Sequence, residues 1–178
     1  LEWRRTSKAL GHGQDLSDVL LSAVAPIDAP LRARLRDGTI GLVSVQWLLS
    51  TAADEAFGRC AETGLPTLTR MQELPEGALL SVRQATSLLD EGSRSVLVLS
   101  HCWQTAAHPD PRGLTLRALR AYLRSDPSTH RCGIFVDYCS LPQKDRRGQR
   151  TPGEASRFKD GLEVMASLYA SLTGTAVL

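Results

Sequence analysis

The stretch Ile134–Asp145, IFVDYCSLPQKD, constrains the fold of this chain more than any other part of its sequence. A short apolar run bounded by breaker residues predicts a buried strand, and here the run ends at Asp137. Val96–Trp103, VLVLSHCW, has the same form, with four apolar residues followed by polar and aromatic ones. In an open α/β sheet, ligands bind just beyond the carboxyl ends of the strands. We therefore expect the residues that follow these two runs to share one pocket.

The sequence after Leu74 predicts alternating helices and strands. The expected order is helix, strand, helix, strand, helix, strand, over Ser81–Asp90, Val96–Leu99, Leu114–Leu123, Ile134–Val136, Thr151–Leu172 and Thr175–Leu178. This order favours a parallel sheet with right-handed crossover connections. The apolar runs lack the alternation of a half-exposed strand, so we expect the three strands to be adjacent and buried.

The first 70 residues are expected to be helical, and they carry no chemical motif. Asp15–Val24 and Ala29–Arg36 are short helix candidates, and a longer helix is expected from Thr39 to about Thr63 because apolar residues recur there at helical spacing. We assign residues 1–70 to a helical N-terminal extension or subdomain and residues 74–178 to an α/β domain. The chain lacks an initial Met and stops inside an apolar segment, GTAVL, so we expect a piece of a longer protein, incomplete at its C-terminus.

Composition excludes several classes of function. A net charge of +2 is too small to favour nucleic acid or an anionic membrane as a partner, and the longest apolar stretch, Ile40–Leu49, is too short to span a bilayer. The four cysteines form no C-x-x-C pair, which favours free thiols in a cytoplasmic protein. No metal site is expected, because the spacing of the candidate ligands His101, Cys102, His108 and Cys139 matches no structural zinc pattern.

Three motifs in order resemble the heterokaryon-incompatibility (HET) domain. They are Leu99-Ser100-His101-Cys102-Trp103, then Val136-Asp137-Tyr138-Cys139-Ser140 with Gln143 close by, then Met165-Ala166-Ser167-Leu168-Tyr169. The resemblance covers about Ser95–Leu178 and is that of a divergent member, since Gln104 replaces the glycine that follows the family's tryptophan. The HET domain is similar to Toll/interleukin-receptor (TIR) domains. The resemblance therefore implies a three-layer, flavodoxin-like parallel α/β sheet, here truncated.

The same resemblance implies two alternative functions. The first is a signalling or innate-immunity interaction domain that works by self-association or by assembly with other protein domains in a larger protein. The second is an NAD-cleaving enzyme of the nucleosidase type that uses a pocket at the strand ends. No cofactor is certain, and NAD enters only as a possible substrate.

Each candidate pocket residue has a functional and a structural interpretation. Asp137 could act on a ribose hydroxyl or a catalytic water, or its carboxylate could accept hydrogen bonds from the following loop. Ser100 and His101 could contact a ligand from the other strand. Trp103 and Tyr138 could stack on a base or a nicotinamide ring, or they could cap the core. Cys139 is expected to be a buried structural thiol.

The last helix contributes the candidate catalytic carboxylate. Phe158, Leu162, Met165 and Tyr169 are expected to face the sheet as one apolar stripe. Glu154 falls within the angular range of this stripe, whereas Glu163 points away. Glu154 is therefore the candidate for catalysis. The alternative is a capping box, since Thr151-Pro152-Gly153-Glu154 has the spacing in which Glu154 reaches back to the helix cap.

The segment Lys144–Arg150, KDRRGQR, is a cationic loop beside the expected pocket. Arg146, Arg147 or Arg150 could hold the phosphates of a dinucleotide, or the loop could be a solvated surface segment. The chain has no glycine-rich phosphate loop, which disfavours the usual dinucleotide and ATP binding modes.

Overall fold

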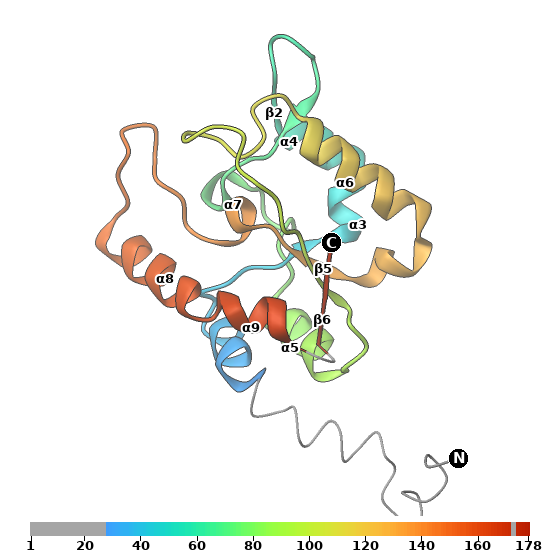
Figure 1. Cartoon of the computed structure of the whole chain (residues 1–178), viewed down its shortest axis with the longest axis vertical. Helices are drawn as coiled ribbons and strands as arrows, with labels where there is room; N and C mark the ends of the chain where they lie inside the picture. The colour runs from blue at the N-terminus through green and yellow to red at the C-terminus, as the bar shows by residue number, and fades with distance from the viewer. Residues whose placement is uncertain (1–27, 172–173) are drawn as a thin grey trace, which may run out of the picture.

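The computed structural model describes residues 28–171 and 174–178 of the 178-residue chain (Figure 1). The predicted helix Asp15–Val24 lies outside this part. The described chain is mixed α/β, with a four-stranded sheet in the order β1-β5-β4-β6 and a separate two-stranded sheet, β2-β3. The strands are β1 (Val43–Ser44), β2 (Gly58–Arg59), β3 (Pro66–Thr67), β4 (Val96–Val98), β5 (Gly133–Phe135) and β6 (Thr175–Val177).

The parallel pairing of the three predicted strands is confirmed. Strand β4 lies between β5 and β6 and is parallel to both. Every residue of β4 and β5 is buried, as the unbroken apolar runs predicted. Strand β6 lies at the sheet edge, and its Val177 is 49% exposed, so the expectation of burial is wrong for that residue.

The predicted helix over Thr39–Thr63 is wrong. Strand β1 lies within it and pairs antiparallel with β5, which makes the sheet mixed rather than fully parallel. Two serines cap the N-termini of separate short helices in this region. Ser44 Oγ accepts from Trp47 N–H, and Ser50 Oγ accepts from Ala53 N–H. The consecutive buried residues Leu42 and Val43 fit a strand with both faces covered, which one helical stripe does not provide.

Helices cover both faces of the four-stranded sheet. They comprise residues 28–36, α3 (Val45–Leu48), α4 (Thr51–Ala56), α5 (Val82–Asp90), α6 (Leu114–Ser125), α7 (Asp137–Ser140), α8 (Pro152–Glu163) and α9 (Met165–Ala170), with 3₁₀ turns at Met71–Glu73 and Pro127–Arg131. The shorter predicted helices at Ala29–Arg36, Ser81–Asp90 and Leu114–Leu123 are confirmed within a few residues.

The core is divided by the sheet into two apolar clusters. Leu97 and Ile134 pack on one face with α3, α4 and α6. Val96, Val98 and Phe135 pack on the other face with residues 28–36, α5 and α9. The alternation of neighbouring strand residues between the clusters follows from the period of two along a strand. The described chain therefore has a helical layer on each side of the sheet, visible in Figure 1.

The predicted long helix Thr151–Leu172 is interrupted at Val164, which ends α8 and precedes α9. Val164 and Leu168 are buried, whereas Leu162 is 46% and Tyr169 is 39% exposed. The predicted sheet-facing stripe is therefore wrong for Leu162 and Tyr169, because the break changes which residues of α9 meet the core, whereas Phe158 and Met165 are partly buried against the core as predicted. In α8, Gly161 packs directly against Leu141, and a Cβ atom there would lie 2.4 Å from Leu141 Cδ2.

Within residues 28–171 and 174–178, no helix is both long enough and apolar enough to cross a membrane. All four cysteines are free, as expected: Cys60, Cys102, Cys132 and Cys139.

Candidate functional site

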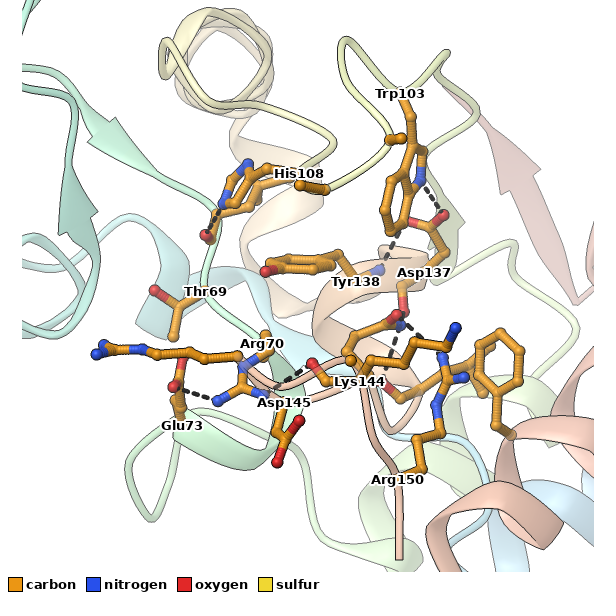
Figure 2. A pocket seen from close by; sticks show the side chains of 18 of the residues that line it. Thr69, Arg70, Glu73, Trp103, His108, Asp137, Tyr138, Lys144, Asp145 and Arg150 are labelled. Atoms are coloured by element: carbon orange, nitrogen blue, oxygen red, sulfur yellow. Dashed lines mark hydrogen bonds and ion pairs between the residues drawn. The ribbon is translucent and has the colours of Figure 1, made fainter.

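A cleft of about 930 Å³ opens where the chain leaves β4 and β5. Its walls come from four segments: residues 58–73, the loop after β4, the loop 137–150 after β5, and α8–α9. Figure 2 shows its central side chains. Its lining includes Arg70, Glu73, Trp103, His108, Asp137, Tyr138, Gln143, Lys144, Asp145, Arg146, Arg150, Phe158, Leu162 and Met165.

The centre of the cleft is built around Asp137, the first residue of α7. Trp103 Nε1–H donates to Asp137 Oδ2 at 2.7 Å, and the Tyr138 backbone N–H donates to Asp137 Oδ1 at 2.6 Å (Figure 2). The Trp103 and Tyr138 rings meet edge to face with centroids 5.7 Å apart. Asp137 Oδ2 therefore joins the segment after β4 to α7, while Oδ1 bonds within α7 itself.

His108 forms the next wall and contacts the Tyr138 ring, with centroids 4.9 Å apart. Its Nε2 lies 3.0 Å from the Leu68 carbonyl oxygen, and its Nδ1 lies 3.0 Å from the Asp110 backbone nitrogen. The carbonyl can only accept and the N–H can only donate, so the ring is neutral with its proton on Nε2. Burial lowers the pKa of His108, which agrees with this neutral form.

The loop that carries His108 is fastened to α6 by Asp110, which is fully buried. Asp110 Oδ1 accepts from Thr115 N–H and Oδ2 accepts from Leu116 N–H, so the carboxylate caps the first turn of α6. Gly113 precedes this helix with φ of 71°, and a Cβ there would lie 2.4 Å from the Pro66 carbonyl oxygen. The loop that carries His108 is thus fixed both by the Asp110 cap and by the close packing of Gly113 on Pro66.

The segment after α7 is held by two glutamines. Gln72 Nε2–H donates to the Gln143 carbonyl and Gln72 Oε1 accepts from the Gln143 N–H, at 2.8 and 3.1 Å. The Gln143 side chain donates to the carbonyls of Asp137 and Leu141. Arg150 Nε donates to the Pro142 carbonyl at 2.7 Å. These bonds fix both ends of the cationic loop.

The rim of the cleft is cationic. Arg70 pairs with Glu73 at 2.5 Å and also donates to the Lys144 carbonyl, as Figure 2 shows. The Arg70 hydrogen bond lowers the pKa of Glu73, and Arg146 lowers it further. Asp145 Oδ1 accepts from the backbone N–H groups of Arg147 and Gln149, which closes the turn of this exposed loop.

Glu154 lies outside the cleft lining and is bound in a capping box. Its Oε2 accepts from Thr151 N–H at 2.8 Å, while Thr151 Oγ1 accepts from Glu154 N–H at 3.3 Å. Its Oε1 accepts from Gln72 Nε2–H at 3.0 Å. The bond from Gln72, followed by those from Thr151, lowers the pKa of Glu154 to about 2. Glu163 is exposed, as expected.

Ser100, His101 and Arg147 also lie outside the cleft lining. Ser100 N–H donates to the Leu178 carbonyl at 3.1 Å, so the chain after β4 is still paired toward β6 at this point. The structure therefore brings Trp103, Asp137, Tyr138 and Arg146 together but leaves the other candidates outside.

Cys139 is buried beneath the cleft, and its Sγ–H donates to the Thr69 carbonyl at 3.2 Å. Burial raises the pKa of this thiol to about 12, so it stays protonated at neutral pH. In the described ranges, no group of three or more His, Cys, Asp or Glu side chains is arranged to hold a metal ion.

Sequence reasoning missed Arg70, Glu73 and His108 as members of the site. Arg70 ends the region assigned to helices and Glu73 lies between the two assigned regions, and only long-range packing brings them to the cleft. The sequence did carry a signal for His108. Asp110 stands shortly before the helix that begins at Leu114 and is a candidate cap for it, and such a cap would anchor the loop that carries His108.

Comparison with known proteins gives no relative. No family model, no curated protein and no solved structure matches the chain. The geometry of the site therefore carries the functional argument.

Proposed function

We propose that this chain is an interaction domain of the signalling or immunity type, which works in the cytoplasm by assembling with itself or with other protein domains. The proposal includes the divergent HET/TIR-like, flavodoxin-type fold. A direct contact between the first two motifs supports it, because Trp103 of the first motif bonds to Asp137 of the second.

One observation carries the choice of an interaction domain over an enzyme. The reactive groups at the cleft already have structural partners: both Asp137 oxygens, both His108 nitrogens and the Cys139 thiol. General acid–base catalysis needs a group that can exchange a proton with a substrate. The reactive atoms of this cleft form hydrogen bonds within the protein. Such a cleft is suited to recognition of a partner by shape and charge.

The alternative function, cleavage of NAD, is favoured by the aromatic and cationic side chains of the same cleft. That reaction requires a carboxylate that can approach the nicotinamide–ribose bond. Asp137 is the carboxylate at the cleft centre, while Glu154 lies outside the lining in its capping box.

The test measures release of nicotinamide from millimolar NAD by the purified protein, alongside Asp137→Asn. Sedimentation velocity over a range of protein concentrations, in the same buffer, measures self-association. We expect no turnover by the parent chain. Turnover that is lost in Asp137→Asn would overturn the interaction proposal in favour of the enzyme.

A further inference from the structure

One wall of the cleft is an apolar surface formed by Phe158, Leu162 and Met165 on α8 and α9. Leu162 is 46% exposed, and Trp103, on the facing segment, is 39% exposed. Large apolar side chains at the two sides of one cleft leave apolar area in water, and its removal from water favours binding. The cleft therefore offers an anchor site for an apolar side chain.

The rim of the same cleft offers positive charge. Among the described residues, neither Lys144 nor Arg146 has a hydrogen-bond or salt-bridge partner for its side chain. Three cations, Arg70, Lys144 and Arg146, stand at this rim beside two carboxylates: Glu73, which pairs with Arg70, and Asp145, whose Oδ1 binds backbone N–H groups. Lys144 and Arg146 are thus available to an acidic group from outside.

The aromatic rings of the cleft are poorly placed to stack on a base. Tyr138 is only 8% exposed, because His108 and Trp103 both pack against it. The Arg150 guanidinium lies 3.6 Å from the Phe158 ring centroid and covers that ring. The α8 N-terminus, a potential phosphate site, is taken by the ionised Glu154.

We propose that the cleft docks a peptide segment of a partner protein in which a large apolar side chain lies next to acidic residues. The apolar side chain packs on Leu162 and Met165, and the carboxylates bind Lys144 and Arg146. This inference rests on the proposed function, for which it names the chemistry of the partner.

The test presents the purified protein with a library of degenerate peptides about ten residues long, which span roughly 33 Å when extended. The retained pool is sequenced. The cleft variant is Lys144→Glu with Arg146→Glu, and a second variant is Leu162→Lys. The matched control is Arg83→Glu with Lys159→Glu, which makes the same change in net charge at exposed positions outside the cleft.

We expect the parent protein to enrich peptides that combine Asp or Glu with a neighbouring Leu, Phe or Trp. The Lys144→Glu, Arg146→Glu variant should lose the acidic preference by about tenfold or more, since reversal of rim charges turns attraction into repulsion. Leu162→Lys should lose the apolar preference, and the control pair should keep both.

Three results would overturn the inference: no enrichment by the parent protein, an acidic preference that survives the Lys144→Glu, Arg146→Glu change, or enrichment of basic or neutral peptides. Cleft-dependent enrichment of another peptide class would leave the interaction function standing and reject only the acidic chemistry. Turnover of NAD by the same preparation would reject the interaction function itself.

Discussion

The indole N–H of Trp103 donates a 2.7 Å hydrogen bond to the carboxylate of Asp137, which joins the segment after β4 to the start of α7. The two residues are 34 positions apart in the sequence. The bond links the carboxyl ends of two neighbouring parallel strands and shapes the cleft between them.

Removal of this bond should destabilise the protein. We expect Trp103→Phe to lower the free energy of unfolding by about 1 kcal/mol, because the bond has a charged acceptor but lies near solvent. A double-mutant cycle with Asp137→Asn, followed by urea unfolding, should give a coupling energy of similar size. The pair Trp47→Phe and Asp137→Asn should be additive, and equal coupling in both cycles would contradict a direct bond.

His108 should make stability depend on pH near neutrality. Its pKa is lowered in the fold, so the unfolded chain binds the proton more readily, and stability is lost as pH falls below about 6.5. Thermal unfolding between pH 7.5 and about 5 measures this loss, below the ordinary His pKa. His108→Gln should reduce the dependence, whereas the exposed His130→Gln should leave it unchanged.

Glu154 should affect stability only while it is ionised. Its pKa is lowered from 4.5 to about 2, so its contribution is present above pH 4.5 and is lost as pH falls toward 2. We expect Glu154→Gln to be less stable than the parent at pH 7 and to approach it in acid, as measured by circular dichroism. A difference of equal size for Glu163→Gln would contradict the specific role of the capping box.

The break at Val164 gives a prediction about which side of the last helices is buried. Leu168→Ala should cost about 2–5 kcal/mol, because it removes a fully buried leucine side chain. Leu162→Ala should stay within about 0.5 kcal/mol, since its side chain is largely exposed. Equal costs in urea unfolding would favour the uninterrupted helix that the sequence predicts.

The cysteines should differ sharply in reactivity. Cys139 is buried, and its thiol has a pKa raised to about 12, whereas Cys102 is exposed. In native protein at pH 8, iodoacetamide should label Cys102 well before Cys139, as mass spectrometry of tryptic peptides would show. Rapid labelling of Cys139 without unfolding would contradict the burial.

Local sequence signals predicted the three parallel strands, and the reasons are visible in the residues. The apolar runs around Leu97 and Ile134 are short, unbroken and bounded by polar residues, so each indicates a buried strand without knowledge of its neighbours. The strand-end rule then placed Trp103, Asp137 and Tyr138 at one cleft.

What the sequence could not predict depends on long-range contacts. Strand β1 has only two residues and forms because β5 offers an edge to pair with. Glu154 matched both an apolar stripe and a capping box in pattern, with the capping-box spacing favoured, and the bond from Gln72, 82 positions earlier, reinforces the capping position. Arg70 reaches the rim through the carbonyl of Lys144, 74 positions later.

The antiparallel pairing of β1 with β5 has a consequence for how the chain reaches its native state. Residues 43–44 meet residues 133–134, so the ribosome must make some 90 intervening residues before this pair can close. Until then, β1 leaves the ribosome without its partner strand, although the N-terminal parts of a protein generally fold first during synthesis. A fragment that starts at residue 74 would lack β1 and so leave the edge of β5 unpaired. An exposed edge strand of this kind promotes aggregation.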